Sequence, residues 1–178
     1  MINRQLLALA VTLSATATAV PAAATLPTPP QGAATREAQA YLFHSGAGDV
    51  FEITTSMMLL QKSQNPQVRA FATMLISDHT MLSNTALATA KGAGVMPPPP
   101  ELSPMQKGMI GQLMSASPAT IDRVYLQQQV PAHQQALSIN TGYSRSGDVP
   151  ALRGAATGAV PRIQQHLTEA QQLLRSVR

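Results

Sequence analysis

The strongest constraint on the fold of this chain is a helical spacing of apolar residues that begins near Thr35 and continues to the C-terminus. No alternating run of β-branched residues is long enough to predict a strand. Prolines divide the pattern into segments, because a proline is well tolerated in the first turn of a helix and poorly further in. The sequence therefore predicts an all-α fold, with long helices over residues 35–63, 66–91, 118–146 and 149–176 and a short helix from Ser103-Pro104 to about Ser115.

The links between these segments predict how the helices are arranged. Asn65-Pro66 and Ser146-Gly147 leave only a short turn between neighbouring long helices, so each pair is expected to be antiparallel. The proline run at 96–100 and the short helix form a long crossover between the second and third long helices. Two short links and one long crossover predict a ferritin-like four-helix bundle.

The first 24 residues have the pattern of a secretory signal peptide. Arg4 precedes an apolar run, and Ala22 and Ala24 supply small residues at the cleavage positions. The run is shorter than the ~20 residues that span a bilayer, which favours cleavage after Ala24 over an uncleaved anchor. Residues 25–34 are Pro-rich and are expected to form a flexible leader, with the bundle domain over residues 35–178. We therefore expect a periplasmic or secreted protein without a stable membrane span after cleavage.

Composition excludes several classes of function. The 178 residues include no cysteine, which excludes disulfides, thiolate metal sites and cysteine nucleophiles. Aromatic residues make up 3% of the chain and the basic residues are scattered, which argues against nucleic-acid binding. No Gly-rich phosphate loop or serine elbow follows a strand. A binding or structural protein is therefore expected rather than an enzyme, and a protein partner or a homo-oligomer is left open.

Five polar residues from four predicted helices fall at about the same level of the bundle, as judged from a rise of ~1.5 Å per residue. Asp78 and His166 lie on apolar stripes and are expected to point inward. The other residues at this level are Glu52, His79 and His133. Glu52 and His133 flank their stripes and are expected at the boundary of the core. The stripe predicted beside Glu52 consists of Leu42, Val50, Ile53, Met57 and Leu60.

Two interpretations of these five residues are open. Buried carboxylates and imidazoles that satisfy one another would form a network that sets the register of the helices. Alternatively, they would bind a transition-metal ion, because imidazole and carboxylate together suit Zn, Cu, Fe or Mn. Di-iron chemistry in this fold requires Glu-x-x-His on two helices, and the chain contains no such pair.

Three segments also resemble a known family. The segment from Asn65-Pro66 to Asp78-His79 is the most specific, and the segments at 121–125 and 160–166 add to it, together with His133. They are similar to the family called domain of unknown function 4142, over about residues 38–175. Ile121 and Val160 depart from its usual Phe and Leu. The resemblance implies an exported bacterial protein with a ferritin-like bundle, and the family has no settled activity to transfer.

Overall fold

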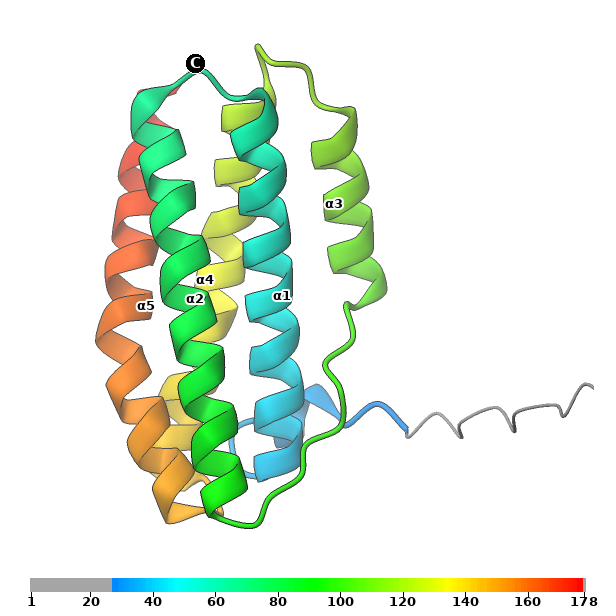
Figure 1. Ribbon diagram of the computed structural model, residues 1–178, viewed down its shortest axis with the longest axis vertical. Coiled ribbons are helices and arrows are strands. Elements are labelled where there is room, and N and C mark those ends of the chain that lie inside the picture. The colour runs from blue at the N-terminus through cyan, green and yellow to red at the C-terminus, as the bar shows by residue number, and fades with distance from the viewer. Residues whose placement is uncertain (1–26, 178) are drawn as a thin grey trace, which may run out of the picture.

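The computed structural model describes residues 27–177, which form five α-helices, one short 3-10 helix and no strand (Figure 1). The all-α prediction is confirmed. The predicted signal peptide, residues 1–24, lies outside the described residues. The elements are η1 (Gln31–Ala33), α1 (Ala38–Lys62), α2 (Pro66–Gly92), α3 (Pro104–Ser115), α4 (Ile121–Ser146) and α5 (Pro150–Ser176).

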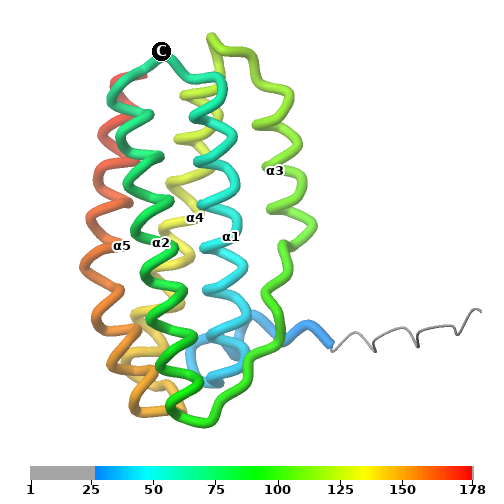
Figure 2. The backbone as a smooth tube through the Cα atoms, viewed as in Figure 1, coloured from blue at the N-terminus to red at the C-terminus, as the bar shows by residue number. Residues whose placement is uncertain are grey.

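Four long helices lie side by side, and the shorter α3 lies outside them, next to α1 (Figure 1). Residues 63–65 link α1 to α2, and residues 147–149 link α4 to α5. Residues 93–120 form the crossover, which returns along the outside of the bundle so that α4 begins at the end where α1 finishes (Figure 2). In addition to the contacts of α1 with α2 and of α4 with α5, α1 packs against α4 and α2 packs against α5.

Local capping explains why the helices begin where the sequence predicts. The Asn65 side chain accepts hydrogen bonds from the backbone N–H groups of residues 67 and 68, and Pro66 occupies the first turn of α2. Ser103 and Gln106 form a capping box at the start of α3. The third long helix differs, because residues 118–120 form a turn and α4 begins only at Ile121.

Two apolar clusters fill opposite ends of the bundle. We call the end with the α1–α2 link the α1–α2 half and the opposite end the α4–α5 half. The buried cluster of the α1–α2 half consists of Leu59, Val68, Phe71, Ala72, Leu75, Leu113, Ile121, Tyr125, Leu126 and Ala170. That of the α4–α5 half consists of Ala34, Ala38, Tyr41, Leu42, Ala90, Ile139, Tyr143, Leu152 and Ala156. Among the described residues, no helix combines the length and apolar character needed to cross a bilayer.

The predicted apolar stripe of α1 is wrong. Of its members only Leu42 is buried, whereas Val50 is 40% and Met57 is 55% exposed. The buried face of α1 lies one residue further round and is largely polar, with Phe51, Glu52, Thr55, Ser56 and Leu59. The hydroxyl groups on this face form hydrogen bonds within the bundle. Thr55 donates to the Phe51 carbonyl, and the Ser56 hydroxyl lies 2.7 Å from that of Tyr125. Internal hydrogen bonds allow polar side chains to be buried on this face, whereas the apolar-stripe rule assumes that buried positions are apolar.

Candidate metal centre

The structure brings the five predicted site residues together between the two apolar clusters. Glu52 comes from α1, Asp78 and His79 from α2, His133 from α4 and His166 from α5. All five are buried. The expectation that Glu52 and His133 lie at the boundary is therefore wrong, because this layer of the interior is polar and its inward positions do not follow the apolar stripes.

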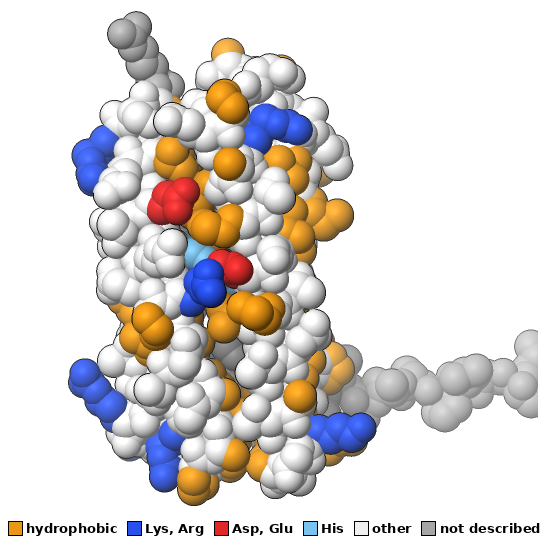
Figure 3. Space-filling model, turned by 60° about the vertical axis from the view of Figure 1, so that its left-hand side comes forward, with side chains coloured by type: hydrophobic (Ala, Val, Ile, Leu, Met, Phe, Trp, Pro, Cys, Tyr) orange, Lys and Arg blue, Asp and Glu red, His pale blue; other side chains and the backbone are white. Residues whose placement is uncertain are grey.

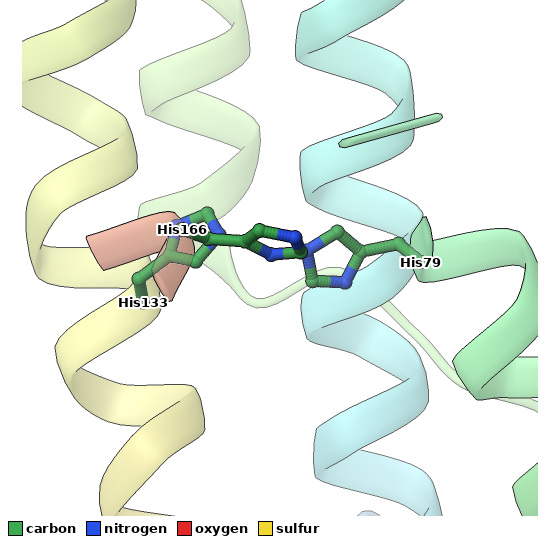
Figure 4. Close-up of side chains that lie close together, drawn as sticks. All are labelled: His79, His133 and His166. Carbon is green, nitrogen blue, oxygen red and sulfur yellow. The ribbon is translucent and has the colours of Figure 1, made fainter. Parts of the chain in front are cut away.

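The side chains of His79, His133 and His166 lie close together inside the bundle (Figure 4), and their ring centroids form a nearly equilateral triangle. Their ring centroids are separated by 5.5 Å from His79 to His133, 5.3 Å from His79 to His166 and 5.4 Å from His133 to His166. Each ring offers a nitrogen, and these nitrogens all lie within 4.8 Å of one another. Three imidazoles that bind one ion at about 2.0–2.1 Å place their centroids about 5.2–5.6 Å apart. The spacing of the three rings thus fits a single metal ion.

One nitrogen of each ring is held by a hydrogen-bond acceptor. His79 Nδ1 lies 2.8 Å from Asp49 Oδ1, and His133 Nδ1 lies 2.9 Å from the Gln129 carbonyl oxygen. His166 Nε2 lies 2.9 Å from Asp78 Oδ2. Because carbonyl oxygens and carboxylates accept, each of these nitrogens carries a proton, a tautomer assigned here from the hydrogen-bond network.

The opposite nitrogens are left without partners. Within residues 27–177, His79 Nε2, His133 Nε2 and His166 Nδ1 are buried and make no hydrogen bond. A buried polar atom without a partner costs about 1–3 kcal/mol, so three in one cluster need an explanation. An imidazole with one nitrogen on an acceptor and the other free is the arrangement of metal-binding histidines.

Asp49 is the functional candidate that sequence reasoning missed. Its carboxylate accepts from His79 and also from the Ser83 hydroxyl, at 2.6 Å. Asp49 and Glu52 are three residues apart on α1 and therefore share a face of that helix. This three-residue spacing is the sequence signal that could have identified Asp49, because a helix that turns Glu52 inward also turns Asp49 to nearly the same side.

Glu52 lies between two of the histidines. Its carboxylate oxygens are 3.0 Å from His79 Nδ1 and 3.4 Å from His133 Nδ1. Neither contact has hydrogen-bond geometry, so within the described chain both oxygens remain without a donor. Glu52 therefore acts on the two rings through its charge, and Asp49, Glu52 and His79 form a second group of potential metal ligands.

These charges divide the histidines into two kinds. Burial opposes ionisation of Glu52, but His79 and His133 outweigh it and lower the pKa of Glu52 to about 2. Burial would likewise lower the pKa of His79, but Glu52 and Asp49 raise it to about 10. Burial prevails at the other two rings: it lowers the pKa of His133 and brings the pKa of His166 to about 4. In the metal-free protein at neutral pH, His79 is a cation and the other two rings are neutral.

Asp78 connects the histidine cluster to the surface. Besides accepting from His166, its Oδ2 lies 3.3 Å from Arg162 Nη1, and the Arg162 side chain is 43% exposed. Figure 3 shows acidic and basic side chains together at mid-height on one face, with a histidine beside them. Asp78 on α2 and Arg162 on α5 thus form a polar chain from the buried His166 to a partly exposed side chain.

The family model for a domain of unknown function, DUF4142, matches residues 23–173. The chain belongs to this family. No curated protein matches it.

Two solved structures resemble this DUF4142 bundle. A DUF305 fragment from Deinococcus radiodurans aligns with a TM-score of 0.67 and 18% identity, covering 85% of this chain and 99% of the fragment. CopM, solved in its Cu(II)-bound form, aligns with a TM-score of 0.66 and 16% identity, covering 79% of this chain and 97% of CopM. At these identities the likeness concerns the fold.

The fourth histidine of the DUF4142 chain, His44, stands apart from the cluster. It is half-buried on α1, and its Nε2 donates to the Pro29 carbonyl at 2.8 Å. His44 therefore pins the N-terminal segment to the bundle and provides a control for experiments on the other three.

Proposed function

We propose that this protein binds one transition-metal ion through His79 Nε2, His133 Nε2 and His166 Nδ1. The observation that carries the proposal is the close approach of three buried imidazoles, each of which has one nitrogen without a hydrogen-bond partner in the described part of the chain. Imidazole nitrogens suit copper and zinc, and the chain has no thiolate to compete. Binding would replace the proton on His79 Nε2 and satisfy all three nitrogens at once.

The surrounding charges favour a dication. Asp49, Glu52 and Asp78 bring three carboxylates to the cluster. Once His79 has given up its proton, Arg162 is the one basic side chain among residues 27–177 that pairs with any of them. Asp49 and Asp78 would hold the rings in place as outer partners. The likeness to CopM in its Cu(II)-bound form makes copper the first ion to test, with zinc as the second.

The alternative is a structural network without a metal. Hydrogen bonds of His166 to Asp78 and of His79 to Asp49 favour it, since they tie α5 to α2 and α2 to α1. This interpretation explains one nitrogen of each ring and leaves the three unpartnered nitrogens unexplained. The two interpretations differ in what added metal does.

The test is retention of metal by purified protein. After treatment with EDTA, addition of Cu²⁺ or Zn²⁺ and desalting at pH 7.5, we expect about one ion per chain and a raised melting temperature. His133→Ala and His166→Ala should each abolish retention, whereas His44→Ala should retain the ion. Wild type without bound metal, or His166→Ala that binds as wild type does, would leave the structural network as the better account.

We also propose that the protein is exported and that its connectivity is of the ferritin-like type. The signal-peptide pattern and the membership of DUF4142 support the first, and the long crossover between α2 and α4 supports the second. Protein recovered from the periplasm should begin at or next to Thr25, as read by mass spectrometry of the intact chain. An intact Met1 in the membrane fraction would indicate an uncleaved anchor instead.

A further inference from the structure

Two carboxylates of α1 lie against the same nitrogen of His79. His79 Nδ1 is 2.8 Å from Asp49 Oδ1 and 3.0 Å from Glu52 Oε2. Two ligand atoms that meet an ion at right angles, each about 2.0–2.2 Å from it, are separated by about 2.8–3.1 Å. The three atoms therefore have the spacing of neighbouring ligands of one ion, next to the His79 nitrogen that the proposed three-histidine centre does not use.

The negative charge at this position is not balanced. Among residues 27–177, no lysine or arginine forms an ion pair with Asp49 or Glu52, so the His79 cation is shared between two carboxylates. Asp78 differs, because Arg162 Nη1 lies 3.3 Å from the oxygen that accepts from His166. A buried carboxylate needs a counter-charge, and a dication would supply to Asp49 and Glu52 what Arg162 supplies to Asp78.

Glu52 is the group in this layer that most requires a ligand. Its side chain is 1% exposed, and within the described chain neither carboxylate oxygen receives a hydrogen bond. Both oxygens are also closed to water, so solvent does not satisfy them. An ion held by Asp49 and His79 satisfies Glu52 Oε2 without opening it to solvent, because that oxygen already lies 3.0 Å from His79 Nδ1.

Asp49 connects this group to a largely enclosed cavity of about 840 Å³. The Asp49 side chain is 16% exposed, and its Oδ2 accepts from the Ser83 hydroxyl at 2.6 Å, which fixes the carboxylate and turns Oδ1 towards His79. An ion that arrives through the cavity therefore meets Asp49 first and displaces the proton between Oδ1 and His79 Nδ1. Water from the cavity completes its coordination.

Small side chains keep this cavity open. Its wall is rich in alanine, whereas the α1–α2 half buries leucine, phenylalanine and tyrosine. Residues 101–107 of the crossover close the outer side, and Gln106 Nε2 donates to the Ala47 carbonyl at 3.2 Å. Helices held at bundle spacing cannot collapse onto alanines, so space for water persists beside Asp49. The alanines of the wall are Ala47, Ala86, Ala132, Ala136, Ala155 and Ala159.

We propose that Asp49, Glu52 and His79 Nδ1 bind a second divalent cation that prefers oxygen ligands, and that Mn²⁺ is the ion that fits best. Two carboxylates, one imidazole and water form a harder set of ligands than three imidazoles, which suit copper and zinc. Binding releases the Nδ1 proton to solvent. The second site requires no ion at the three-histidine centre, because His79 Nε2 keeps its proton when that centre is empty. When both are filled, His79 has given up both ring protons and bridges the two ions.

The test is a titration of metal-free protein with Mn²⁺, followed by electron paramagnetic resonance at room temperature. Free Mn²⁺ gives a six-line signal that binding broadens. The measurement is made at equilibrium, because Mn²⁺ is the most weakly bound of the first-row dications and would be lost on desalting. We expect one saturable site per chain in the wild type and in His166→Ala, which lacks the three-histidine centre. Pulsed measurements should show one imidazole nitrogen bound to Mn²⁺.

Variants locate the ion. Asp49→Asn and Glu52→Gln keep the shape of each side chain and remove its charge, and each should weaken Mn²⁺ binding about tenfold or more, since each removes a direct ligand. Glu101→Gln removes an exposed carboxylate from the wall of the same cavity and is the matched control, which should bind Mn²⁺ as wild type does. Circular dichroism checks that each variant is folded.

Several outcomes would overturn the second site. Wild type that leaves the six-line signal unchanged does so, as does Mn²⁺ binding that Asp49→Asn and Glu101→Gln affect equally. Mn²⁺ binding that is lost in His166→Ala and kept in Asp49→Asn places the ion at the three histidines and overturns it as well. Failure of the three-histidine centre gives a different result: copper and zinc are not retained, but Mn²⁺ still binds to His166→Ala, which supports the second site alone.

Discussion

The two halves of the bundle use the same helices in different ways. The α1–α2 half is filled by large buried side chains, among them Phe71, Leu75 and Tyr125. The α4–α5 half contains many alanines and adjoins the cavity of about 840 Å³. Since helical periodicity is similar in both, side-chain volume rather than periodicity decides which half is dense.

The polar layer with the histidine cluster lies between these halves. Burying carboxylates and imidazoles is unfavourable unless they are paired, and a cavity contributes no packing energy. We infer that the α1–α2 half stabilises the fold, and that the α4–α5 half and the polar layer carry function. Four predictions test this division.

The largest effect on stability is expected from a substitution that creates a cavity in the α1–α2 half. Phe71→Ala should lower the free energy of unfolding by about 3–5 kcal/mol, because the ring is fully buried and its neighbours cannot collapse into the space. Met57→Ala, at a half-exposed position on the wrongly predicted stripe of α1, should cost less than about 1 kcal/mol. Urea unfolding measures both. Equal losses would show that the stripe, not the observed face, packs inward.

The polar layer should make the metal-free protein most stable near neutral pH. The pKa of His79 is raised to about 10, so its contribution is complete below its ordinary value near 6.5 and is lost as the pH rises towards 10. The pKa of Glu52 is lowered to about 2 and that of His166 to about 4. Their contributions are present above their ordinary values and are lost as the pH falls towards those lower ones.

The alkaline side of this profile can be isolated with one variant. Between pH 7 and 9 in EDTA, we expect a loss of about 2–3 kcal/mol, since a proton held only by the folded state changes stability by about 1.4 kcal/mol per pH unit. His79→Gln should flatten this decline and leave the acid side in place. A wild-type profile that is flat from pH 7 to 9 would show that His79 is not a buried cation.

The sequence predicted the helices better than their inward faces. Local signals such as Asn65-Pro66 and Ser103-Pro104 set where helices begin, and residue rise alone placed the five site residues at one level. The direction in which each side chain points was harder to predict, because the apolar-stripe rule assumes that buried positions are apolar. That assumption failed for Glu52 and His133, which lie in a polar layer, and it hid Asp49.

The cavity could not be predicted for a different reason. It depends on the summed volumes of side chains from five helices and on the position of the crossover. Ala136 and Ala159 are unremarkable in the sequence, and only their common orientation makes them a wall. Likewise, which nitrogen of His166 is free depends on the Asp78 carboxylate, 88 residues away along the chain.

A third prediction compares the two halves with the same substitution. Ala72 and Ala159 are both buried alanines in long helices, the first in the dense cluster and the second in the wall of the cavity. Ala72→Leu should destabilise by about 1–3 kcal/mol through overpacking. Ala159→Leu should change stability by less than about 1 kcal/mol, because the added atoms enter existing space. Similar losses in urea unfolding would mean that the α4–α5 half is as tightly packed as the other.

The smallest effect tests whether looseness in the α4–α5 half extends to the packing of its backbone. A Cβ at Gly158 in α5 would meet nothing within 4 Å, whereas one at Gly142 in α4 would lie 2.5 Å from Thr35 Cγ2 and 2.8 Å from Thr35 Cβ. Gly158→Ala should therefore stabilise by about 0.5–1 kcal/mol, since alanine loses less backbone freedom in a helix. Gly142→Ala gains the same propensity but must displace the segment at Thr35, so a net loss of about 1 kcal/mol is expected. Thermal melts of both variants against wild type measure the difference, and stabilisation by both would show that the segment at Thr35 moves aside for the added Cβ without a net cost.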